Sequence, residues 1–313
     1  MDSTPVEASP SAPYALVVGE SLVDVVTTRA GTVEHPGGSA ANVAVALARL
    51  GRPVRFATSF ADDDRGRAVA THLDRAGVVL ATDPHVVART SSAQATIGPD
   101  GAASYVFDLD WRLGPVTAVE DETPRVVHVC SLGAVLAPGA ADVQALLDRL
   151  AAGTAPFVSY DVNARPAITG TGADVVAAVE DVARRAHLVK ASDEDLEGLY
   201  PELGVDAAAR HLLTLGPAAV VVTRGGDGAS WFADADRTDI PGVPTTVVDT
   251  IGAGDTFSAG LLDALWDHVG ARPGAGLADV DVAAVMGHAA RAAAVTVSRP
   301  GADPPTRAEL DAR

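Results

Sequence analysis

Short, continuously apolar segments alternate with helical patterns along most of this 313-residue chain. The apolar segments are 15–19, 126–130, 157–161, 187–190 and 219–223, and the helical patterns are 41–50, 143–150 and 175–186. Strands that are apolar throughout are typical of a mostly parallel sheet that helices cover on both faces. The pattern therefore predicts a doubly wound α/β fold, in which ligands bind at the carboxyl ends of the strands.

Two segments, 23–34 and 88–107, interrupt this alternation. Together they are rich in Val, Thr, Ser and Tyr, and each contains a turn signal, at 29–31 and at 98–101. Such sequences favour hairpin-like strands. Because each segment lies beside a candidate ligand loop, we expect them to form a small β lid outside the main sheet.

The chain shows no internal repeat and no clear interdomain linker. Residues 14–313 are therefore predicted to form a single domain. Residues 1–13 contain three prolines, three serines and no apolar run, and they lack the charged and apolar regions of a signal peptide. We expect this stretch to be a disordered tail.

The net charge of −18 argues against nucleic acid or an acidic membrane surface as a partner. A phosphorylated ligand stays open, because it needs only local positive potential. Cys130 is the only cysteine, so no intramolecular disulfide can form, which fits a cytoplasmic location. No run of about 18 apolar residues is present, and we expect no membrane span.

A glycine-rich turn at 249–257 carries the strongest chemical signal. Gly252 and Gly254 allow the backbone to approach a ligand closely, and Asp255 opens a helix whose apolar face begins at Phe257. Unpaired N–H groups at a helix start form an anion site. Such a turn could hold a phosphoryl group while Asp255 accepts a proton from an attacking hydroxyl. The alternative is an ordinary glycine loop in which Asp255 caps the helix.

Two further clusters lie near the amino terminus. Asp24 follows the first predicted strand, where it could accept hydrogen bonds from sugar hydroxyls or serve as a turn residue. Gly37 and Gly38 run directly into a helix that carries Asn42 in its first turn and ends at Gly51. The glycine pair permits close backbone approach, and the Asn42 amide offers both a donor and an acceptor.

Residues 37–51 resemble the first signature of the PfkB (ribokinase-like) sugar kinases, and residues 249–257 resemble the second, at the family's spacing. The similarity extends from about residue 14 to 305. It implies that Asp255 is the catalytic base and that Gly252, Ala253 and Gly254 form the anion hole. The residues that it implies for sugar binding are Asp24, Gly37, Gly38, Asn42 and Asp255.

The resemblance also implies an ATP site. Residues 223–228 resemble the family's nucleotide loop, although without the family these glycines would indicate only a turn after a strand. The implied nucleotide contacts are Lys190, Ser192, Thr223, Gly225, Gly226, Gly228 and Gly254. Asp249 lies where the family places a monovalent cation, so K⁺ is a candidate cofactor beside ATP and Mg²⁺.

Four shorter segments, at 110–113, 161–166, 190–196 and 199–201, are most similar to bacterial fructokinases within this family. Arg165 offers a planar cation for a phosphate or a sugar oxygen, and its alternative is a surface salt bridge.

The sequence departs from the family at the magnesium site. Many members carry Asn-x-x-Glu where this chain has Ser192-Asp193-Glu194-Asp195. Glu194 and Asp195 are therefore the candidates for Mg²⁺ contact through water, and the choice among the three carboxylates stays open. His288 stands where relatives often have Asn near the adenine, and we assign it no role.

The sequence thus predicts an ATP-dependent sugar kinase that converts D-fructose to fructose 6-phosphate, with sugar and ATP as partners and homodimerisation left open. The nearest rival is a 2-keto-3-deoxygluconate kinase, which needs a further cation near the lid, such as Arg89. Nucleoside kinases match residues 190–196 less well. A dinucleotide-dependent oxidoreductase would need GxGxxG after the first strand, which is lacking. A non-catalytic sugar-binding regulator should have lost its base, yet Asp255 is present.

Overall fold

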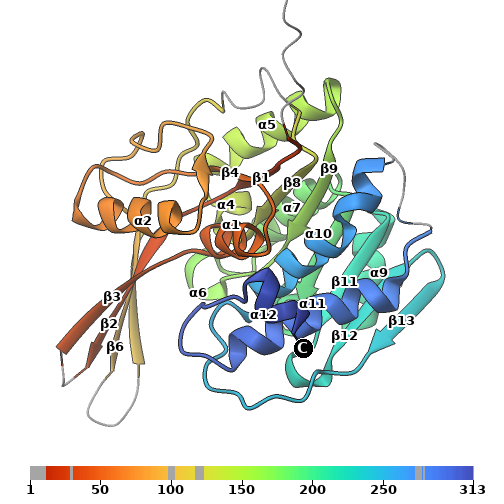
Figure 1. Ribbon diagram of the computed structural model, residues 1–313. Coiled ribbons are helices and arrows are strands. Elements are labelled where there is room, and N and C mark those ends of the chain that lie inside the picture. The colour runs from red at the N-terminus through yellow and green to blue at the C-terminus, as the bar shows by residue number, and fades with distance from the viewer. Residues whose placement is uncertain are drawn as a thin grey trace, which may run out of the picture.

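A nine-stranded sheet forms the centre of the protein, in the order β13-β12-β11-β10-β9-β8-β1-β4-β5 (Figure 1). The parallel strands are β1 (Ala15–Val18), β4 (Val54–Ala57), β5 (Val79–Leu80), β8 (Val126–Cys130), β9 (Phe157–Asp161), β10 (Leu188–Ser192) and β11 (Ala219–Thr223). Two antiparallel strands, β12 (Ala229–Ala233) and β13 (Asp236–Ile240), extend one edge.

This computed structural model describes residues 12–28, 31–97, 103–116, 123–271, 277 and 279–312. The tail predicted at 1–13 lies outside this part except for its last two residues. Residues 29–30 of the first turn signal and the whole of the second, 98–101, also lie outside it.

Helices cover both faces of the large sheet, as the alternating pattern predicts. One face packs against α1 (Ser39–Arg49), α2 (Asp64–Arg75), α10 (Ala253–Ala271) and α11 (Val282–Val297). The other face packs against α5 (Gly139–Ala152), α7 (Ala173–Ala183), α8 (Asp193–Leu199) and α9 (Val205–Thr214). The short helices are α4 (Ser131–Val135), α6 (Pro166–Thr169), η1 (Gly225–Asp227) and α12 (Arg307–Asp311).

The central strands are mostly apolar because successive side chains enter two different cores. In β8, Val126 and Cys130 pack under α1 and α10, whereas Val127 and Val129 pack under the helices of the opposite face. A strand with one wet face would alternate apolar and polar residues instead. The predicted doubly wound fold is confirmed, with helix ends that differ by up to four residues from the expected ones.

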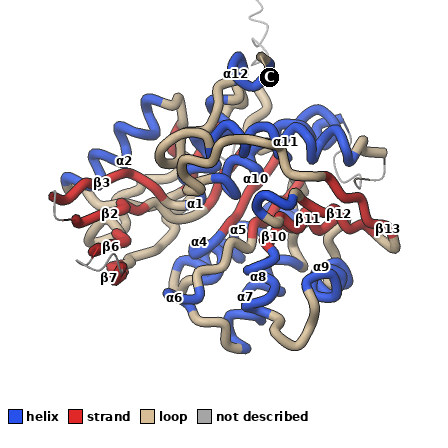
Figure 2. The backbone as a smooth tube through the Cα atoms, turned by 90° about the horizontal axis from the view of Figure 1, so that it is seen from below, coloured by secondary structure: helices blue, strands red, loops and turns tan. Residues whose placement is uncertain are grey.

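A second, four-stranded sheet lies at one end of the molecule, in the order β3-β2-β6-β7 (Figure 2). Its strands are β2 (Leu22–Thr28), β3 (Gly31–Gly37), β6 (Ser92–Ile97) and β7 (Ala103–Asp108). Two antiparallel pairs are joined by the parallel pairing of β2 with β6. The small sheet thus forms from the two segments that break the alternation, and its action as a lid stays a prediction.

Within the described part of the chain, no helix is long and apolar enough to cross a bilayer.

Candidate active site

The amino-terminal ends of α1 and α10 meet, and Asp255 lies at their junction. Its side chain is buried, with the residue only 6% exposed. Ser39 Oγ donates to Asp255 Oδ1 over 2.7 Å, and Asn42 Nδ2 donates to Oδ2 over 2.8 Å. Both carboxylate oxygens are therefore fixed in direction by side chains from α1. Gly252 makes the entry turn with a φ of 75°, a conformation that favours glycine.

The glycine pair before α1 brings three chain segments into close contact. Gly38 has a φ of 103°, and a Cβ there would lie 2.8 Å from the carbonyl oxygen of Glu20. A Cβ on Gly37 would lie 2.4 Å from Asp24 Oδ2. Asp24 is half-buried, and burial raises its pKa, whereas the positive charges of His35 and Arg165 act in the opposite direction. The structure thus places Asp24 beside the predicted sugar loop.

Asn163 joins this network from the carboxyl end of β9. Its Nδ2 donates to Ser39 Oγ over 2.7 Å and to Asp255 Oδ1 over 3.4 Å. Arg165 is exposed and donates to Asn163 Oδ1 over 2.6 Å. Sequence reasoning named Arg165 but missed Ser39 and Asn163, although both lie inside the segments that carry the family resemblance.

Burial dominates the electrostatics of the site. It raises the pKa of Asp255, and the hydrogen bonds from Asn42 and Ser39 oppose that shift. Burial also raises the pKa of Glu20 to about 7, although its Oε2 accepts the Gly133 N–H over 2.7 Å. An ionised Asp255 therefore depends on its amide and hydroxyl donors.

Lys190 and Asp161 form a buried ion pair next to this network, with 2.7 Å between Lys190 Nζ and Asp161 Oδ2. A Cβ on Gly254 would lie 3.4 Å from that Nζ, so the ammonium lies beside the first turn of α10. Lys190 is therefore brought to the predicted anion hole.

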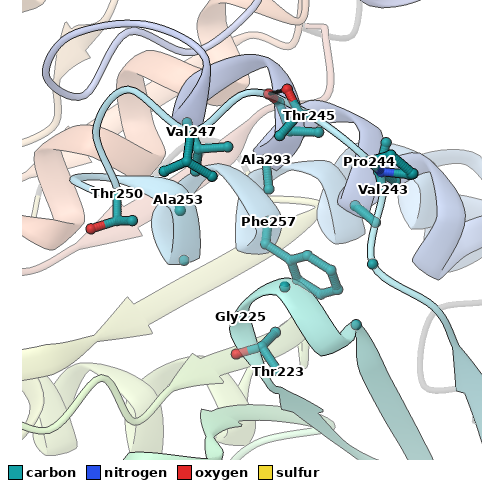
Figure 3. Close-up of a pocket in the computed structure, with 17 residues that line it drawn as sticks. Thr223, Gly225, Val243, Pro244, Thr245, Val247, Thr250, Ala253, Phe257 and Ala293 are labelled. Atoms are coloured by element: carbon teal, nitrogen blue, oxygen red, sulfur yellow. Dashed lines mark hydrogen bonds between the residues drawn. The ribbon is translucent and has the colours of Figure 1, made fainter.

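A cavity of about 470 Å³ opens on the other side of the same turn (Figure 3). In Figure 3 the Phe257 ring projects from α10 toward the loop that carries Thr223 and Gly225. Five predicted nucleotide residues line the cavity: Thr223, Gly225, Gly226, Gly228 and Gly254. Ala253, predicted for the anion hole, also lines it. The remaining lining residues were missed: Gly242, Val243, Pro244, Thr245, Val247, Thr250, Phe257, Ala290, Ala293, Ala294 and Val297.

Glycines shape this cavity because backbone passes against backbone. Gly228 has a φ of 102°, and a Cβ there would lie 2.0 Å from the carbonyl oxygen of Ile240. A Cβ on Gly242 would lie 2.0 Å from the carbonyl oxygen of Gly226. The loop after β11 and the segment that follows β13 can therefore lie this close together only with glycines at these positions.

The predicted metal residues lie at two places. Asp195 and Ser192 form a capping box at the start of α8, and Asp195 Oδ1 also accepts the Ala164 N–H over 2.8 Å. Glu194, one residue earlier, is exposed. Asp249 accepts N–H groups from Ile251 and Gly301 over 3.0 and 2.9 Å.

His288, on α11, belongs to a different cluster. Its Nε2 lies 2.8 Å from Asp263 Oδ2, and Arg52 and Arg307 pair with the same carboxylate. These contacts join the loop after α1 to α10, α11 and α12. They account for His288 without a ligand.

An α/β fold with a small second sheet, a buried carboxylate at a glycine turn and an adjacent nucleotide-sized cavity define a sugar kinase of the ribokinase type. The chain belongs to the pfkB family of carbohydrate kinases, whose model matches residues 13–309.

Individual relatives agree with this placement. A fructokinase of Rhizobium leguminosarum bv. trifolii is 32% identical over 265 residues, covering 80% of this chain and 79% of that protein. A solved fructokinase double mutant of Vibrio cholerae O395, with bound fructose, ADP and potassium ion, is 25% identical with a TM-score of 0.77, covering 97% and 99% of the two chains. Aminoimidazole riboside kinase of Salmonella enterica, at 24% identity, has a TM-score of 0.78 and covers 96% and 99%. The fold therefore does not select the substrate by itself.

Proposed function

We propose that this protein is an ATP-dependent fructokinase that transfers the γ-phosphate of ATP to the 6-hydroxyl of D-fructose. The proposal rests on the position of Asp255, which Ser39 and Asn42 hold by hydrogen bonds. It lies between the predicted sugar loop, beside Asp24, and the nucleotide cavity. The similarity to fructokinases over four fifths of the chain supports fructose as the sugar.

In this proposal Asp255 takes the proton of the sugar's primary hydroxyl as the oxygen attacks the γ-phosphorus. The bond between that phosphorus and the β,γ-bridging oxygen breaks, and ADP leaves. The amides of residues 252–254 and the side chains of Lys190 and Arg165 stabilise charge on the transferring group. Asp24, Gly37, Gly38 and Asn42 hold the sugar hydroxyls. The transition state of phosphoryl transfer is loose, so the protein contributes chiefly positioning and electrostatic stabilisation.

The metal assignments rest on the donors present. No group of three or more His, Cys, Asp or Glu that could hold a metal is found among the described residues. Mg²⁺ fits a site with few protein ligands, because it usually keeps several waters and binds through one or two carboxylates and the substrate phosphates. It would supply charge neutralisation on those phosphates. Glu194 is exposed and suits contact through water, whereas both oxygens of Asp195 already accept backbone N–H groups.

For a monovalent cation we propose Asp249, which joins the turn before α10 to Gly301. Carboxylate oxygens have further lone pairs, so Asp249 can accept a cation as well as its two N–H donors. A K⁺ ion there would pin the turn that forms the anion hole. Activity should then rise when K⁺ replaces a bulky organic cation, and no dependence would remove this assignment.

The small sheet favours a neutral sugar over 2-keto-3-deoxygluconate. Arg89 pairs with Asp108 over 2.6 Å. Asp108 is aligned with Ser92, and Ser92 with Val23, which is buried in the core. Neighbours aligned across a sheet share a face, and successive residues alternate. Arg89 is therefore engaged on the face opposite to Asp24, away from the sugar.

We propose that the face of the small sheet that carries Asp24 closes over the sugar as a lid. Asp24 is aligned with His35 on β3 and with Ala93 on β6, and Ala93 is aligned with Phe107 on β7, so these residues share that face. Deleting residues 92–104 should raise KM for the sugar and the ratio of ATP hydrolysis to transfer, because water would enter the site. Unchanged values of both would exclude a lid.

A coupled assay of ADP release tests the substrate directly. We expect kcat/KM for fructose to exceed that for 2-keto-3-deoxygluconate, ribose and adenosine by at least about tenfold each, or ~1.4 kcal/mol in transition-state binding. Faster turnover of any of the three would keep the sugar-kinase family and overturn the fructokinase proposal.

A further inference from the structure

A buried carboxylate, Asp161, joins the three elements that carry the transfer site. Its Oδ2 accepts from Lys190 Nζ on β10 and from Ser258 Oγ on α10, each over 2.7 Å. The side chains of Asp161 and Lys190 are 1% and 6% exposed. Ser258 follows Asp255 by one helical turn, so the same carboxylate fixes α10 against β9 and β10. Asp161 is not among the site residues predicted from the sequence.

The place of the ammonium is electrostatically unusual. Lys190 Nζ lies beside Gly254, in the first turn of a helix whose unpaired N–H groups carry positive charge. A buried cation there is unfavourable unless anions compensate it. Asp161 supplies one negative charge and receives one of the three ammonium hydrogens. The others suit a second anion that binds at the turn, and a phosphoryl group is such an anion.

We propose that Asp161 is a positioning residue for phosphoryl transfer: it holds the Lys190 ammonium at the first turn of α10, where the ammonium contacts the transferring phosphoryl group. The proposal rests on the sugar-kinase activity and adds a residue whose effect passes through Lys190. Asp161 itself, lying behind the ammonium, does not touch the substrates.

The ion pair also acts on the catalytic base. The negative charge of Asp161 raises the pKa of Asp255, and the positive charge of Lys190 lowers it. Removing one member should therefore shift the acid limb of the pH profile, and removing both should largely restore it. The titratable and charged groups around Asp255 are Glu20 after β1, Cys130 on β8, Asp161 on β9, Arg165 before α6 and Lys190 on β10.

Steady-state kinetics of Asp161→Asn, Lys190→Met and the double variant test the proposal. We expect each single change to lower kcat by about 10- to 100-fold, the scale of losing one electrostatic stabiliser, with KM for fructose nearly unchanged. The acid limb of kcat/KM should move to lower pH in Asp161→Asn and to higher pH in Lys190→Met. The double variant should have the wild-type limb and the kcat of Lys190→Met, because Asp161 acts through Lys190.

Asp263→Asn, on α10, is a matched control, because Asp263 is also buried and ion-paired but lies away from the site. It should lower Tm and leave kcat and the acid limb unchanged. If Asp161→Asn behaves in this way, with kcat within twofold of wild type, the positioning role is overturned. Absence of turnover in the wild-type protein would instead refute the kinase function.

Ser258→Ala decides the matter if Asp161→Asn does not fold. It removes one hydrogen bond to Asp161 Oδ2 without changing a charge, so Asp161 and Lys190 should become less well fixed. We expect kcat to fall about two- to fivefold, the scale of one ordinary hydrogen bond. An unchanged kcat in a folded Ser258→Ala variant would contradict the proposal.

Discussion

The sugar side and the nucleotide side of the site differ in polarity. On the sugar side, Asp255, Ser39, Asn42 and Asn163 form a continuous hydrogen-bonded network that the burial of α1 and α10 fixes in place. On the nucleotide side, the cavity is lined mostly by Gly, Ala, Val and Pro. The first turn of α10 belongs to both, since Ala253 and Gly254 line the cavity and Asp255 faces α1.

This difference shows how each side can select its ligand. A site of paired polar groups rejects an analogue that lacks a hydroxyl, because its own buried groups are then left without partners. An apolar cavity bounded by backbone selects by shape and rejects added volume. We therefore expect polar substitutions to act on the sugar side and volume changes to act on the nucleotide side.

Asp255→Asn should have the largest effect, because it removes the proton acceptor at the junction. We expect kcat to fall by roughly 10²–10⁴, the usual scale of general-base loss, with KM for fructose and ATP nearly unchanged. Because Asn has nearly the same volume as Asp, the variant should fold, and an unchanged Tm is the control. A variant with more than about a tenth of the wild-type kcat would exclude Asp255 as the base.

Glu20→Gln should change the pH dependence of stability, because Glu20 is a buried carboxyl. Because the folded pKa of Glu20 is about 7, above its ordinary 4.5, folding favours the protonated form. Stability should therefore fall as pH rises from about 4.5 to about 7, by up to about 3 kcal/mol, and Gln should remove this fall. Urea unfolding of both proteins at pH 5 and pH 8 measures it. An equal stability difference between the two proteins at both pH values would contradict this account.

Asp24→Ala should weaken the sugar side alone. Loss of a hydrogen bond to a charged group costs about 1.5–3 kcal/mol, which predicts a decrease of about 10- to 100-fold in kcat/KM for fructose. KM for ATP should stay the same, and the preference for fructose over ribose should largely disappear. A matching change in KM for ATP would show that the two sides are not independent.

Ala293→Leu should act on the nucleotide side alone, by filling part of the cavity. Overpacking costs about 1–3 kcal/mol, so KM for ATP should rise about tenfold while KM for fructose stays the same. Arg291→Ala is a control on the same helix, since Arg291 is exposed and does not line the cavity. An unchanged KM for ATP would place the nucleotide elsewhere.

The sequence predicts the large sheet well, because strands buried on both faces are mostly apolar, and their few buried polar residues are paired. It also predicts the turn before α10, where the φ of 75° at Gly252 favours glycine. The parallel pairing of β2 with β6 could not be predicted, because it joins residues about 70 positions apart and leaves no local pattern.

Some residues of the site could likewise be predicted from the sequence and others could not. Asp24, Asn42 and Asp255 were predicted because polar groups stand out beside glycines. Val243 and Ala293 were missed because apolar residues that line a cavity look the same in sequence as residues of the core. The capping box formed by Ser192 and Asp195 could have been read from their spacing, three residues apart.

Identification of the product by ³¹P NMR tests the central claim most directly. Wild-type protein, ATP, Mg²⁺ and D-fructose should yield ADP and fructose 6-phosphate in equal amounts, and Asp255→Asn under the same conditions should yield almost none. Inorganic phosphate in place of a sugar phosphate, or a phosphate on a different hydroxyl of fructose, would contradict the arrangement of sugar, Asp255 and ATP described above.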